Sequence, residues 1–145
     1  MSAKELIQKI KGQRVPDKIR GLMSWENEVD ALFDTMWGWL QPVEKEGLSH
    51  MFSVPQVLPS EDYPWTHKIF LGPLARQNQG ICIEGVAGSF QKGEVTLTSP
   101  FAQAVLRRVQ KRKWEIAKVS GWPLPKRTLY LSSETFLMLM VTLIG

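Results

Sequence analysis

Two histidines and the carboxylates between them are the first residues in this sequence that could do chemistry. His50 and His67 lie in one stretch of the chain, with Glu61 and Asp62 between them. Imidazole and carboxylate groups can ligate a metal ion or exchange protons near neutral pH. Nothing in the spacing places the four side chains on one face. Solvated histidines near strand ends are the favoured interpretation, and no metal or cofactor is predicted.

Cys82, the only cysteine, lies between Ile81 and Ile83. A lone cysteine forms no internal disulfide, and its apolar neighbours favour a buried, inert thiol over a nucleophile. The first ten residues also carry no apolar signal core. Together these features predict a reducing, cytoplasmic compartment.

Short catalytic motifs are absent from the chain. The sequence contains no G-x-S-x-G, no G-x-x-x-x-G-K-[ST], no G-x-G-x-x-G and no H-E-x-x-H. An acidic stripe at Glu26, Asp30 and Asp34 has the ligand type for a divalent cation, but the wet face of an amphipathic helix explains it better. An enzyme of unrecognised class is therefore only the third functional hypothesis, and no catalytic residue is predicted.

Charge is unevenly distributed along the chain. Residues 1–23 hold six basic and two acidic side chains, residues 24–62 hold one basic and eight acidic, and residues 101–145 hold eight basic and two acidic. Either the basic parts face a polyanion, or basic and acidic parts face each other within the fold or across an oligomer. The second interpretation is favoured because most charged faces are solvated or paired.

A basic cluster in the last third predicts the alternative function, nucleic-acid binding. If a helix beginning at residue 101 continues to residue 119, then Arg107, Lys111, Trp114 and Lys118 share one face. Cationic side chains neutralise phosphates, and an indole stacks on an exposed base. The residues predicted for this alternative are Arg107, Arg108, Lys111, Arg112, Lys113 and Trp114.

The chain has more large apolar side chains than one core can cover, which predicts a surface that contacts another protein. Trp37 and Trp39 lie about 160° apart round a helix, so one core face cannot cover both indoles. Residues 136–144 are apolar on every side and need enclosure by the fold or by another chain. This run of 9 residues is too short to span a membrane, which takes about 20.

We therefore predict a non-enzymatic interaction or assembly module that acts through protein–protein contacts, as a homo-oligomer such as a dimer or with another protein. Exposed apolar patches rich in aromatic residues and Met are typical of such surfaces. The predicted contact residues are Trp37, Trp39, Phe136 and Met140.

The pattern of elements predicts an α+β fold in a single domain spanning residues 1–145. N-terminal helices pack on a mostly antiparallel sheet of four to six strands, with a C-terminal helix. Helices are expected at residues 3–11, 24–41 and 101–110. Ser132 is expected to cap a final helix with Glu134 in its first turn, although Val141, Thr142 and Ile144 also fit a central strand. Strands are expected at residues 51–58, 67–71, 81–90, 94–98 and 128–131, with a turn at 91–93 whose glycine takes a positive φ. Residues 113–119 fit either a helix or a strand.

Overall fold

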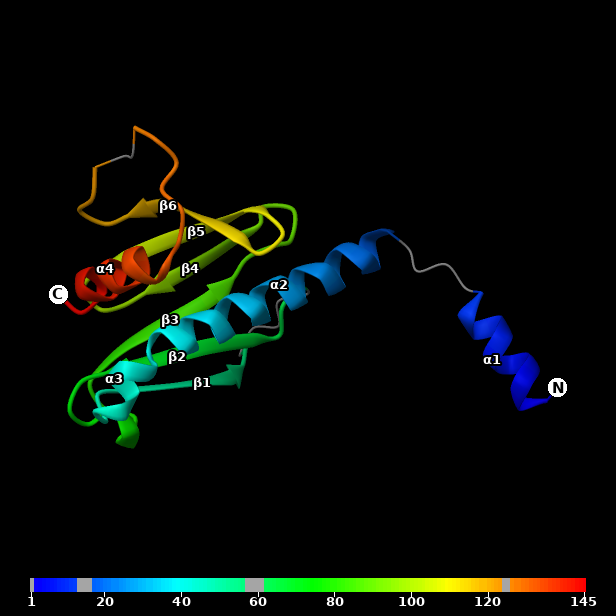
Figure 1. The fold of residues 1–145 in the computed structure, drawn as a ribbon, viewed down its shortest axis with the longest axis horizontal. Helices are drawn as coiled ribbons and strands as arrows, with labels where there is room; N and C mark the ends of the chain where they lie inside the picture. Colours follow the sequence, from blue (N-terminus) through cyan, green and yellow to red (C-terminus); the bar gives the residue numbers. More distant parts are fainter. Residues whose placement is uncertain (1, 13–16, 57–61, 124–125) are drawn as a thin grey trace.

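A computed structural model describes residues 2–12, 17–56, 62–123 and 126–145 (Figure 1). The elements in chain order are α1 (Ala3–Lys11), α2 (Asp17–Trp39), α3 (Gln41–Lys45), β1 (Ser49–Pro55), β2 (Trp65–Leu71), η1 (Ala75–Gln77), β3 (Ile81–Ala87), β4 (Glu94–Thr98), β5 (Gln103–Gln110), β6 (Lys113–Val119) and α4 (Ser133–Leu143). Within these ranges no helix is long and apolar enough to cross a membrane. The predicted strand at 51–58 ends at Pro55, and residues 57–58 lie outside the described part, as does Glu61.

The sheet is an antiparallel meander. Its six strands lie side by side in chain order, from β1 at one edge to β6 at the other. Every neighbouring pair is antiparallel. Gly93, at φ +63°, makes the turn between β3 and β4 as predicted. With helices before and after this sheet, the predicted α+β fold is confirmed.

Helices α2 and α4 cover the same face of the sheet (Figure 1). Apolar residues of α2 recur at steps of three and four and are buried against the strands, while α4 packs beside them through Phe136, whose ring centroid is 5.3 Å from that of Trp39. The core residues of α2 are Trp25, Val29, Leu32, Phe33 and Met36. The opposite face, which we call the open face, carries no described helix.

The predicted helix at 101–110 is wrong, because this segment contains strand β5. Ser99 accepts hydrogen bonds from the backbone amides of Phe101 and Ala102, which makes a turn instead of a helix cap. Ala104 and Leu106 are buried at a spacing of two and pair with β4 and β6. The ambiguous segment 113–119 is likewise a strand, β6, so no helix carries the basic cluster.

Helix α1 stands apart from the sheet, beyond the N-terminal end of α2 (Figure 1). Local signals define it, since the Ser2 side chain accepts from the Glu5 amide and Gly12 follows its last residue. None of its residues is buried. This helix therefore adds nothing to the core of the described subunit.

Candidate interaction surfaces

The outer edge of β1 is open. Among the described residues, no segment pairs with β1 on the side away from β2. The strand reads Ser-His-Met-Phe-Ser-Val-Pro and contains no Lys, Arg, Asp or Glu. An edge strand presents unpaired backbone N–H and C=O groups, and proteins normally protect such edges with charges, bulges or a covering segment. Of these devices β1 has only Pro55 at its end.

A groove runs between α2 and β1, beside this open edge. Its hollow of about 270 Å³ is lined by Phe33, Asp34, Trp37, Met51, Phe52, Ser53 and His67. Trp37 is 49% exposed on α2, in keeping with the expectation that one core cannot cover both Trp37 and Trp39. Apolar walls with one carboxylate at the rim suit an apolar side chain flanked by a cation.

Three polar residues from separate segments meet beside this groove. The Tyr63 hydroxyl lies 2.6 Å from Asp30 Oδ1 and 2.7 Å from His67 Nε2. A carboxylate only accepts, so the hydroxyl donates its proton to Asp30 and accepts from the Nε2–H of His67. Phe33 stacks on the His67 ring with a centroid distance of 3.8 Å. The chain of hydrogen bonds joins α2 to β2 and fixes the tautomer of His67.

Burial sets the protonation state of this network. Burial lowers the pKa of His67 below its ordinary value, against the opposing charges of Asp30 and Asp34. Burial also raises the pKa of Tyr63, and its hydrogen bond to Asp30 raises that pKa further. His67 is therefore held neutral and Tyr63 stays a phenol over the ordinary pH range.

The predicted contact residues divide between the surface and the core. Trp37 is exposed, and Trp39 is half-buried against Phe136. Phe136 and Met140 are buried inside the subunit, so these two side chains do not offer a surface. The exposed apolar residues of α4 are Leu137, Met138 and Val141, and the residue that ends the helix, Ile144, is exposed as well.

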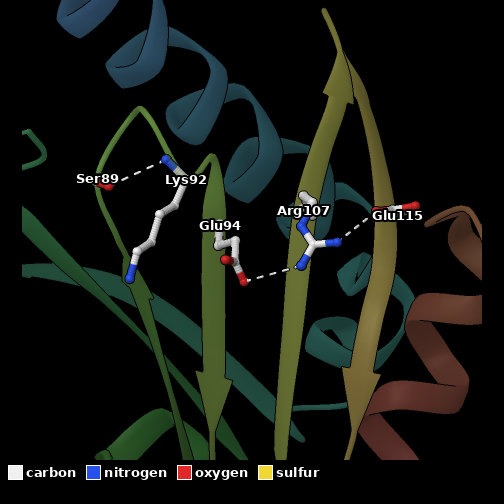
Figure 2. A network of polar contacts seen from close by, with 5 residues as sticks. All are labelled: Ser89, Lys92, Glu94, Arg107 and Glu115. Carbon is white, nitrogen blue, oxygen red and sulfur yellow. Dashed lines mark hydrogen bonds and ion pairs between the residues drawn. The ribbon is translucent and has the colours of Figure 1, made fainter. Parts of the chain in front are cut away.

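The basic cluster is spread over a β-hairpin, and Arg107 is already paired. Its guanidinium lies 3.8 Å from a carboxylate oxygen of Glu94 on β4 and 3.4 Å from one of Glu115 on β6 (Figure 2). The three side chains cross adjacent strands on the open face. Two carboxylates neutralise the charge that a phosphate contact would use. In the same figure, the turn before β4 is tied by the Lys92 amide, which donates to Ser89 Oγ.

Trp114 is buried at 5% exposure and packs on Trp25 with a centroid distance of 5.7 Å. Its ring therefore cannot stack on a base in this conformation. Arg108 lies over the Trp25 ring, and Lys113 lies 4.1 Å from the centroid of Tyr130. Lys111 remains exposed in the turn between β5 and β6. The shared helical face that motivated the prediction does not form.

Arg112 joins the basic third of the chain to the acidic helix α2. Its backbone amide donates to Glu28 Oε2 at 2.9 Å, and its guanidinium Nε lies 3.8 Å from the other oxygen. Arg112 takes φ +61°, a strained conformation for a side-chain-bearing residue, and Glu28 is buried. The favoured interpretation of the charge pattern, pairing within the fold, is realised at this contact.

The histidines do not form the two-histidine site considered from the sequence. His50 lies on the open face, where its ring meets Phe52, whereas His67 lies on the helix-covered face. Asp62 accepts from the Phe90 amide. Across the described ranges, no three His, Cys, Asp or Glu side chains are grouped closely enough to hold a metal ion. Cys82 is half-buried, and burial raises the pKa of its thiol, with Glu84 adding to the shift.

Tyr63 is the polar residue of this network that no sequence pattern singles out. It lies in a loop before β2, far along the chain from Asp30, and only the folded sheet brings the two together. Its spacing of four from His67 is a weak signal, because no helix or strand contains both.

Comparisons with protein-family models, with curated proteins and with solved structures found no match to this chain. The functional conclusion therefore depends on the surfaces described above.

Proposed function

We propose that this protein is a non-enzymatic assembly module whose partner is a second copy of itself, joined through the outer edge of β1. The observation that carries the proposal is the open, uncharged seven-residue edge of β1. Two such edges placed antiparallel complete each other's backbone hydrogen bonds and extend the sheet across a two-fold axis.

Three features support a second copy as the partner. An antiparallel strand pair is self-complementary, so one edge suffices for both subunits. No like charges on β1 oppose each other when two copies meet. Beside the same edge, the groove with the exposed indole of Trp37 offers a further apolar surface to a second copy.

The test is sedimentation velocity over a wide range of concentration, combined with hydrogen exchange. We expect a reversible dimer, and we expect the amides of β1 to become protected as the dimer fills. A protein that stays monomeric at every concentration, with exchange at β1 unaffected, would refute the proposal. A dimer with no added protection at β1 would refute this surface.

Nucleic-acid binding is the second candidate, supported by the surplus of basic residues in the last third of the chain. Arg107 and Trp114 are engaged elsewhere and Arg112 is paired with Glu28, so the exposed cations of residues 107–118 left for this function are Lys111 and Lys118. Steeply salt-dependent binding of RNA or DNA, lost on Lys111→Glu plus Lys118→Glu, would support it. Absence of binding at low ionic strength would remove it.

A further inference from the structure

Helix α1 has an apolar side that nothing described in the subunit covers. Leu6, Ile7 and Ile10 are each about half exposed and lie on one side of the helix. Lys4 and Lys11 flank this stripe on one side and Lys9 flanks it on the other. A nine-residue helix is marginal in water without packing, so its apolar side needs a partner.

The groove between α2 and β1 has the complementary character. Exposed Trp37 and partly buried Met51 supply apolar wall, and exposed Asp34 lines the same groove. Glu26 and Asp30 continue the exposed acidic side of α2 toward its N-terminus. Residues 24–62 carry eight acids against one base, whereas residues 1–23 carry six bases against two acids.

We propose that α1 of one copy docks in the α2–β1 groove of a neighbouring copy. Leu6, Ile7 and Ile10 pack on Trp37 and Met51, and the flanking lysines face the carboxylates of α2. This contact adds an arm to the self-assembly proposed above, but it uses a surface distinct from the backbone edge of β1.

Two observations select a second copy as the occupant. Within one chain, α1 lies beyond the N-terminal end of α2, whereas Trp37 lies near the other end of this helix, which is about 35 Å long. An anionic membrane would attract the lysines of α1 but would repel the acidic segment that follows. The acidic groove of another copy satisfies both the apolar stripe and its lysines.

The test measures binding of a fluorescent peptide with the sequence of residues 2–12 to the full-length protein. The receptor carries Ile7→Asp and Ile10→Asp, which disable its own arm. We expect saturable binding that weakens at least about tenfold with Trp37→Ala or Asp34→Lys in the receptor. Glu46→Lys, the same charge change on the exposed residue that follows α3, is the control and leaves binding unchanged.

A charge exchange sharpens the test. A peptide with Lys4→Glu and Lys9→Glu is expected to bind the original receptor poorly and the Asp34→Lys receptor better. Equal binding to all receptors, or binding only to vesicles containing phosphatidylserine, would overturn the proposal. Val54→Lys alters the β1 edge but does not line the groove. Lost dimerisation with retained peptide binding in this variant would support the docking of α1 as a contact separate from the β1 edge, and loss of both would overturn that separation.

Discussion

The two edges of the sheet differ in their protection: β6 is covered and charged, whereas β1 is open and uncharged in the described structure. At β6, the Ile116 amide donates to the Leu129 carbonyl at 2.7 Å, and the Leu131 amide donates to the Trp114 carbonyl at 2.9 Å. Lysines and a glutamate add charge to that strand. At β1, neither a covering segment nor a charge is present in the described structure. The sheet can therefore be extended by a further strand at β1 but not at β6.

The largest effect on stability is expected when a tryptophan at the β6 edge, rather than one beside β1, is replaced by alanine. Trp114 on β6 is buried against Trp25, so Trp114→Ala is expected to lower the free energy of unfolding by about 3–5 kcal/mol. Trp37 beside β1 is half exposed, and Trp37→Ala is expected to change the free energy of unfolding by about 0.5 kcal/mol or less. Urea denaturation of the two variants measures both values. Similar losses would mean that Trp37 belongs to the core and not to a contact surface.

The elements that sequence patterns predict well are those specified locally. The recurrence of Trp25, Val29 and Met36 identifies α2, and Gly93 identifies the turn before β4. Segment 101–110 fails because Ala102, Val105 and Val109 recur at helical steps of three and four, whereas Ala104 and Leu106 are the residues that alternate into the core. Pairing with β4 and β6, the strands directly before and after it in the chain, settles that segment, and the pattern leaves residues 113–119 undecided between helix and strand.

The candidate surfaces are less predictable for the same reason. The angular separation of Trp37 and Trp39 shows that one indole is exposed, but not that β1 lies beside it. Phe136 and Met140 belong to a helix that is apolar all round, so its buried side cannot be read from the pattern. The network of Asp30, Tyr63 and His67 draws on three segments and exists only in the fold.

The second prediction tests whether the groove beside β1 depends on Phe33. A Cβ atom at Gly85 would lie 2.5 Å from Phe33 Cζ, so alanine there must push the ring away from His67. Gly85→Ala is expected to lower the free energy of unfolding by about 1–3 kcal/mol and to weaken binding of the residue 2–12 peptide in the groove. Gly88→Ala is the control, because its added Cβ would meet only a backbone oxygen at 3.5 Å. Thermal denaturation measures the stability of both variants. Equal stability of Gly85→Ala and Gly88→Ala would show that Phe33 can move without cost.

The third prediction gives β1 the protection that β6 already has. Val54→Lys places a charge on the open edge, and we expect the dimer dissociation constant to rise about tenfold, which corresponds to about 1.4 kcal/mol. Thr128 is exposed and lies just before the segment that covers β6, so Thr128→Lys is expected to leave the dimer dissociation constant unchanged. Sedimentation of the two variants makes the comparison. An effect of equal size at both positions would point to net charge and not to the edge.

The smallest expected effect is a pH dependence specific to the β1 side. The folded protein holds the pKa of His67 below the value of 6.5 found in an unfolded chain. The unfolded state therefore binds the proton first, and stability present above pH 6.5 is lost as the pH falls from 6.5 through the folded pKa. The loss is at most about 1.4 kcal/mol per pH unit for one group.

Replacing His67 removes this acid sensitivity, whereas replacing His50, which has no part in the Tyr63 network, retains it. The measurement is the free energy of unfolding of His67→Gln, His50→Gln and the original chain across pH 5 to 8. Because His67 pairs with Ser53 of β1, we also expect its protonation to loosen the groove and weaken docking on the acidic side of the transition. An identical slope in all three proteins would show that the network carries no proton linkage, and the two edges would then differ in pairing alone.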